Sequence, residues 1–154
     1  MNGLMHNFPL WAALASIVLA QAAKVPLHWF SSGRWDPARC VGTGGMPSSH
    51  SAGVSSLAAA VGMTEGFSSS VFAVAVLVGV ITMYDAAGIR RHAGLHAAFL
   101  NRLIRTLTSS QPSQLPEQAG PMLKERLGHR PIEVAAGAVF GIAVSVLLHL
   151  CVRP

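Results

Sequence analysis

The sequence predicts an all-α polytopic membrane protein, a bundle of about four short transmembrane helices with one amphipathic helix at the interface. Hydrophobic residues make up 51% of the 154 residues and charged residues only 11%, whereas a typical soluble domain carries about 25% charged residues. The mean hydropathy is +0.47. The apolar residues are gathered in long segments, and the basic residues lie mostly between them. We expect one membrane domain over 1–154.

Four apolar segments are candidates for membrane helices, and a full crossing needs about 20 residues. We expect a short helix over 8–23 that ends at Lys24, then helices over 51–63, 71–84 and 134–152. Only the last segment reaches the full length by itself. The segment 51–63 is weakly apolar but rich in Ala, Ser and Gly, a composition that suits close packing between membrane helices. Hydropathy alone would make 51–63 a surface helix or loop, whereas this composition favours a crossing.

The basic residues divide unequally between the two sides of such a bundle. If 51–63 crosses, the loops 24–49 and 85–131 share one side, here called the motif side, and both termini lie on the other. The basic residues of the motif side are Lys24, Arg34, Arg39, Arg90, Arg91, Arg102, Arg105, Lys124, Arg126 and Arg130. Because Lys and Arg accumulate in cytoplasmic loops, we expect a cell (plasma) membrane protein whose motif side is cytoplasmic. Nucleic-acid binding is excluded, since the basic residues flank apolar segments.

The segment 94–107 has a helical period with two unlike faces. Its apolar face holds Phe99, Leu100, Leu103, Ile104 and Leu107, and Arg102 and Arg105 point away from it. This pattern predicts an amphipathic helix that lies in the membrane interface. Residues 108–121 are polar and contain three prolines, so they predict a loop.

Gly137 and Gly141 form a GxxxG motif in the last apolar segment. Such glycines let two helices approach closely. The motif could support a homodimer, and packing within one chain explains it at least as well. Cys40 and Cys151 lie far apart without a CxxC motif, so no metal site or disulfide is implied.

The first candidate site segment is 42–50, GTGGMPSSH. Its glycines, Gly45 among them, let backbone N–H groups turn toward an anion. Ser48 and Ser49 can cap the following helix, whose N-terminus also attracts phosphate. His50 is the titratable side chain of this loop. The alternative is a capped helix after a flexible turn, in which His50 has no chemical role.

The second candidate segment contains His129 and Glu133. Pro131 suits a first helical turn, so His129 directly precedes a helix N-terminus. Glu133, four residues further on, could reach the imidazole, which would fix its tautomer and make the other ring nitrogen a better nucleophile or base. Ordinary helix capping by Glu133 is the alternative.

The third candidate segment, 84–92, ends an apolar helix with Asp85, Arg90 and Arg91. Arginine can bind a phosphate through two hydrogen bonds. Asp85 is expected to pair with an arginine and orient it, because an unpaired carboxylate at a membrane border is costly. Interfacial anchoring of the helix is the alternative. With Lys24, all three segments collect on the motif side, which indicates a site for a phosphate-bearing ligand.

Three sequences, GGMPSSHSA, YDAAGIRRHAG and LKERLGHRPIEVAAG, together resemble the divergent branch of the type 2 phosphatidic acid phosphatase and vanadium-dependent haloperoxidase superfamily. The resemblance covers nearly the whole chain. It implies a membrane phosphatase that needs no metal or other cofactor and acts through a phosphohistidine. PSSH at 47–50 is similar to the PSGH motif, which implies that His50 protonates the leaving group. His129 matches the nucleophile, Glu133 replaces the orienting Asp, and Lys24 matches a phosphate-binding Lys.

The chain departs from the wider superfamily pattern at two arginines. Ser31 and Leu123 stand where that pattern has Arg. The missing charges could come from Arg34 or Arg39, and from Arg90, Arg91 or Arg126.

The leading hypothesis is a phosphatase that hydrolyses a lipid phosphate monoester at the cytoplasmic leaflet. Lys24, Arg90, Arg91 and the 44–49 backbone would hold the phosphate. The alternative is a non-catalytic membrane protein that binds anionic lipid or a phosphorylated ligand, or a subunit of a transport assembly, and the missing arginines favour it. A haloperoxidase is disfavoured, since vanadate would need the same arginines.

Overall fold

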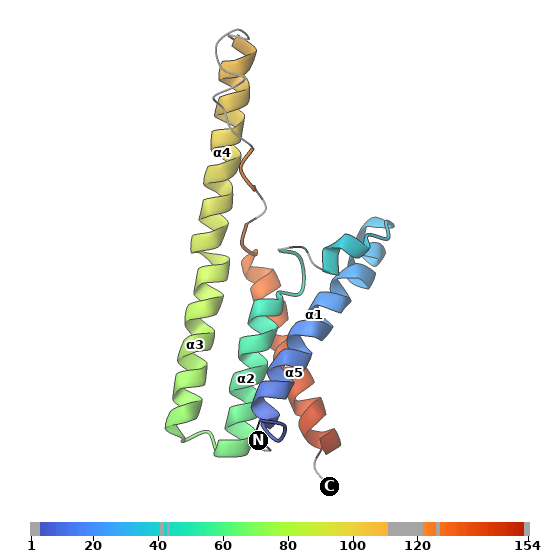
Figure 1. The fold of residues 1–154 in the computed structure, drawn as a ribbon, viewed down its shortest axis with the longest axis vertical. Helices are drawn as coiled ribbons and strands as arrows, with labels where there is room; N and C mark the ends of the chain where they lie inside the picture. The colour runs from blue at the N-terminus through green and yellow to red at the C-terminus, as the bar shows by residue number, and fades with distance from the viewer. Residues whose placement is uncertain (1–3, 41, 43, 111–121, 126, 153–154) are drawn as a thin grey trace.

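The computed structural model describes residues 4–40, 42, 44–110, 122–125 and 127–152. The helices are α1 (Phe8–Ser32), the 3-10 helix η1 (Pro37–Cys40), α2 (Ser49–Glu65), α3 (Ser70–Ala87), α4 (Ile89–Ser110) and α5 (Pro131–Val152). No strand occurs within those ranges, so the predicted all-α class is confirmed. Helices α1, α2, α3 and α5 form a bundle in which α2 contacts each of the other three (Figure 1).

Helix α1 is longer than the sequence predicts. It is capped by Asn7, whose side chain accepts a hydrogen bond from the Leu10 N–H (3.0 Å), and it ends at Gly33, where φ is 68°. The expected end at Lys24 is wrong, because the helix continues through Lys24 and Pro26 to Ser32. Lys24 is only 4% exposed. Its charge therefore does not end the helix but faces the bundle interior, as charges in membrane helices usually do.

Helix α2 is the central helix of the bundle, and its buried residues are mostly Ser, Ala and Gly. Its weak apolarity has a physical reason, because the neighbours of these residues are other helices. Three helical stretches are long and apolar enough to cross a membrane, Phe8–Ser32, Ser70–Leu107 and Pro131–Val152, against the four predicted. The 17 residues of α2 extend about 26 Å at 1.5 Å per residue, close to the ~30 Å of a hydrocarbon core.

The two ends of the bundle differ in what they carry (Figure 1). The start of α1, the turn between α2 and α3 and the end of α5 lie at one end. The segment before α2, the junction of α3 with α4 and the start of α5 lie at the other. The three candidate segments therefore share one end, as an alternating topology requires.

Helix α4 continues in the direction of α3, beyond the bundle (Figure 1). The predicted amphipathic helix is present, and Phe99 and Leu103 are 68% and 44% exposed. The expected orientation across the end of the bundle is not seen, because α3 is joined to α4 at Gly88 without a reversal of direction. The predicted loop 108–121 begins later, since α4 extends to Ser110. Residues 111–121 lie outside the described ranges.

The GxxxG motif is used within the chain. A Cβ atom on Gly137 would collide with the Ser48 backbone, and one on Gly141 with the Ala52 backbone. The two glycines thus bring α5 against the first turns of α2, which is the packing within one chain that the sequence also allows for this motif.

Replacing Gly141 with Ala should destabilise the bundle. The added methyl group would force α5 away from Ala52, and overpacking of this kind typically costs about 1–3 kcal/mol. The matched control is Val139→Ile, which adds one methyl group at a side chain that is 70% exposed. Thermal unfolding in detergent is the measurement, and equal midpoints for the two variants would contradict this packing.

Candidate functional site

The segment before α2 places His50 at the first turn of that helix. Gly44 and Gly45 have φ of 85° and 84°, which favours glycine at both positions. Ser48 is the N-cap, as predicted, and its hydroxyl accepts a hydrogen bond from the Ser51 N–H (3.3 Å). Ser48 and Ser49 are 0% and 7% exposed. They form the buried base of the loop, whereas the His50 side chain is exposed.

A backbone contact ties this loop to the start of α5. The Ser48 N–H donates to the carbonyl oxygen of Glu133 (3.0 Å). The close approach of Gly137 to Ser48 lies one turn further along α5. The first turns of α2 and α5 are therefore held side by side.

The His129 ring lies next to the His50 ring. The ring centroids are 5.9 Å apart and the ring planes meet at 75°. The backbone N–H of His129 donates a hydrogen bond to the Ala86 carbonyl oxygen at the end of α3 (2.9 Å). Gly128, with φ of 78°, packs so closely on the Arg90–Arg91 backbone that a Cβ atom would collide with it.

The His129 side chain is buried, and one of its ring nitrogens is unsatisfied. The residue is 5% exposed. Its Nε2 has no hydrogen-bond partner within the described part of the chain. Most buried polar atoms in proteins are hydrogen-bonded, so this ring nitrogen calls for an explanation.

Glu133 does not make the predicted hydrogen bond to the His129 ring. Its carboxylate accepts from the Arg130 N–H at the start of α5 (3.0 Å), which is the helix-capping arrangement. The charge of Glu133 nevertheless acts on His129. Its contribution is electrostatic.

The charge balance around His129 favours the neutral imidazole. Burial lowers the pKa of His129 from its ordinary value of 6.5; Glu133 raises it, and Lys24, His50 and Arg90 lower it further. Desolvation disfavours the imidazolium ion, and the cations add to that effect.

Asp85 pairs with Arg90, as predicted. The distance from Arg90 Nε to Asp85 Oδ2 is 2.6 Å. Arg90 and Lys24 lie within electrostatic reach of both His50 and His129. Arg91 is brought to the same place by its backbone contact with Gly128, but its exposed side chain is not among the charges that act on the two histidines.

The structure distinguishes among the arginines that could replace the two missing ones. Leu123 lies beside Asn101, and the helix from residue 90 to residue 101 is about 16 Å long at 1.5 Å per residue. The position of Leu123 is thus remote from the histidines, and Arg90 is the nearby cation. Arg39 pairs with Asp36 (3.4 Å), and Arg126 lies outside the described ranges.

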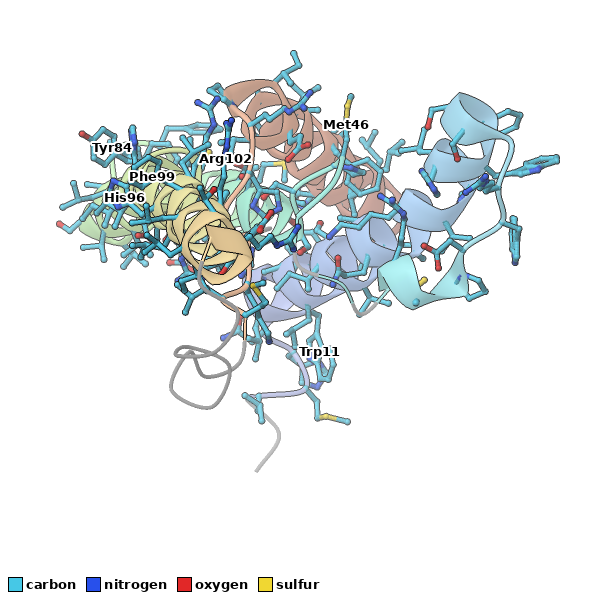
Figure 2. All side chains as sticks on the ribbon, turned by 90° about the horizontal axis from the view of Figure 1, so that it is seen from above. Trp11, Met46, Tyr84, His96, Phe99 and Arg102 are labelled. Atoms are coloured by element: carbon cyan, nitrogen blue, oxygen red, sulfur yellow. The ribbon has the colours of Figure 1, made fainter. Side chains whose placement is uncertain are left out.

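One other feature, a groove, lies away from the histidine pair. An open, mostly apolar groove crosses the α3–α4 junction on its outer side, where Figure 2 shows Tyr84 and His96 far from Met46 of the loop before α2. Within the described ranges, no three side chains of His, Cys, Asp or Glu are grouped as metal ligands.

Sequence reasoning missed Asn101. This side chain is 2% exposed, and it bonds to the segment 122–125, which returns along α4 toward α5. A lone Asn in an amphipathic helix gives no motif, and its partner is a backbone more than twenty residues away. No local sequence signal could have identified it.

The fold and the site define a helical membrane protein that gathers two histidines and several cations at one end of its bundle. The profile of the Divergent PAP2 family matches residues 5–144, and the chain belongs to that family. It is 43% identical over 151 residues to the uncharacterized membrane protein YuiD of Bacillus subtilis (strain 168), which covers 94% of this chain and 96% of that relative. No solved structure matches the chain. The family resemblance of the three sequence segments is confirmed.

The titration of His129 should respond with opposite signs to two substitutions. Lys24→Met removes a positive charge that lowers the pKa of His129, so that pKa should rise. Glu133→Gln removes a negative charge that raises it, so the pKa should fall further below 6.5. Histidine NMR of labelled protein in detergent measures both shifts. Two shifts in the same direction would contradict the described charge arrangement.

Proposed function

We propose that this protein is a membrane-embedded phosphatase that hydrolyses a lipid phosphate monoester through a phosphohistidine on His129. The observation that carries the proposal is the unsatisfied, buried Nε2 of His129 beside the His50 ring. In the tautomer protonated at Nδ1, Nε2 would carry the lone pair that attacks phosphorus, and no hydrogen bond within the described residues occupies it. Family membership supports the proposal.

The proposed reaction has two steps. Nε2 of His129 forms a bond to phosphorus, the bond from phosphorus to the alcohol oxygen breaks, and that oxygen takes a proton from the His50 imidazolium. A water molecule then attacks the phosphohistidine and gives a proton to His50, while the P–N bond breaks and inorganic phosphate leaves. His50 thus serves as the general acid in the first step and as the general base in the second.

The phosphate charge requires cations, and the same end of the bundle supplies them. Lys24 and Arg90 act on both histidines, and Asp85 holds Arg90 through its Nε. The remaining N–H groups of that guanidinium stay available for phosphate oxygens. Such preorganised charges provide much of the transition-state stabilisation in phosphoryl transfer. Arg91 and the Gly45 backbone would add contacts, and Ser48 and Ser49 would fix the loop.

Replacement of His129 tests the nucleophile. His129→Ala is expected to abolish phosphate release from phosphatidic acid, phosphatidylglycerophosphate and polyprenyl phosphates in micelles. His50→Ala should lower kcat by about 10²–10⁴-fold, the usual contribution of a general acid. Activity should persist in a metal chelator, since the proposed mechanism uses no metal.

His96→Ala is the matched control, because His96 is an exposed histidine outside the site. Rapid acid quench with labelled substrate should leave acid-labile phosphate on the wild-type chain and none on His129→Ala. Undiminished turnover by His129→Ala would remove His129 from the mechanism.

A second candidate is a non-catalytic protein that binds anionic lipid or a phosphorylated ligand, or a transport-assembly subunit. The specific observation in its favour is Leu123 in place of an arginine, far along α4 from the histidines. This candidate predicts lipid-phosphate binding without turnover or histidine labelling, so the same experiments separate the two.

We also propose that the site faces the cytoplasm across the plasma membrane, as the distribution of basic residues indicates. Single cysteines at Trp35 and Ser68, both exposed, report opposite ends of the bundle once Cys40 and Cys151 are replaced by Ser. A membrane-impermeant maleimide should label Ser68→Cys on intact cells and spare Trp35→Cys. The reverse pattern would invert the topology.

A further inference from the structure

The segment that returns from α4 to α5 runs beside α4 (Figure 1). Its described residues, 122–125, 127 and 128, have no regular secondary structure and are here called the return strand. Asn101 Nδ2 donates to the Leu123 carbonyl oxygen (2.8 Å) and to Glu125 Oε1 (2.9 Å), and Asn101 Oδ1 accepts from the Leu123 N–H (3.0 Å).

Closer to the bundle, two glycines bring the return strand onto the helix. A Cβ atom on Gly94 would lie 2.7 Å from the Glu125 carbonyl oxygen and 2.9 Å from that of Leu127. Gly128 then packs on the Arg90–Arg91 backbone. The next residue is His129, whose N–H is bonded to Ala86. Contacts at helix positions 101, 94, 90–91 and 86 thus follow one another along the α3–α4 axis.

We propose that Asn101 is a positioning residue for His129, and that α4 serves as the support that holds the return strand and sets where the imidazole lies relative to His50. Asn101 does not touch the reacting atoms. The Asn101 amide nitrogen donates to the Leu123 carbonyl oxygen, and the amide oxygen accepts from the Leu123 N–H. These two hydrogen bonds fix the position of the return strand along α4. The proposed function makes this placement matter for catalysis.

Within the described ranges, α4 packs on no helix of the bundle except α3. An effect of α4 on the position of His129 can therefore be distinguished from an effect on the stability of the bundle. Loss of the Asn101 contacts should therefore leave α1, α2, α3 and α5 assembled. It should release the return strand and expose His129, which is 5% exposed in the intact structure.

Asn101→Ala tests the proposal through the exposure of His129. Purified protein in detergent is treated with diethyl pyrocarbonate, and carbethoxylation of each histidine is followed by mass spectrometry. We expect His129 to react slowly in the wild type and several-fold faster in Asn101→Ala, with the exposed His50 and His96 as internal references. Leu103→Ala, on the exposed face of α4, is the control and should leave His129 protected.

Gly94→Ala is the second variant, and it keeps the test decisive if Asn101→Ala does not fold. Alanine favours helix more than glycine does, but its methyl group would collide with the Glu125 and Leu127 carbonyl oxygens, so some loss of stability is expected whatever the role of α4. Positioning predicts in addition that the methyl group displaces the return strand from the helix. His129 should then become reactive at temperatures well below the unfolding midpoint, where the bundle is still folded.

Turnover gives a separate readout. Misplacement of a reacting group by about 1 Å can cost 10²-fold, so kcat for lipid phosphates should fall by about that factor in both variants while KM changes little. The acid limb of the pH profile should move up toward 6.5 as burial of His129 is lost. Continued protection of His129 in both variants would overturn the proposal. Absence of turnover in the wild type would instead overturn the proposed function and leave the exposure test intact.

Discussion

The close backbone contact between α2 and α5 is the constraint on which the rest of the structure depends. Gly137 and Gly141 allow α5 to approach Ser48 and Ala52 without an intervening side chain. The Ser48 N–H is bonded to the Glu133 carbonyl oxygen at the same level. Since His50 and His129 each stand at the start of one of these helices, fixing the two helix starts also fixes the distance between two rings that are far apart in the chain.

Burial and charge act together at this end of the bundle. Lys24 and His129 are almost fully buried. Among the described residues, Glu133 acts on both of them and Asp85 acts on His50, and these two carboxylates already have partners in the Arg130 N–H and in Arg90. A site with excess positive charge and one unsatisfied ring nitrogen is suited to an anion. Burial first, and then this positive charge, lower the pKa of His129 and favour the neutral imidazole, the form that can act as a nucleophile.

The sequence predicts the parts of this fold that follow from local pattern. Apolar length and small-residue composition identified the helices, and the Ser48 cap and the Asp85–Arg90 pair followed from residue type and spacing. The sequence does not predict the extension of α1 past Lys24, because a charged residue indicates the end of a membrane helix unless the residues that bury it are known. Glu133 was assigned to the imidazole because spacing alone cannot choose between a ring and a backbone N–H one residue away. Asn101 was invisible because its role depends on a backbone segment distant in sequence.

The departure from the superfamily pattern at position 123 has a structural explanation. At position 123 this chain uses the backbone, through Asn101, rather than a side chain. The arginine beside the histidines comes from the first turn of α4, where Asp85 holds it. The backbone of Arg90 is held by the hydrogen bonds of α4, whereas a cation at position 123 would lie on a segment without regular secondary structure. With Arg90 next to the histidines, the proposed phosphate site does not need a cation at position 123, and the return strand has the single role of placing His129.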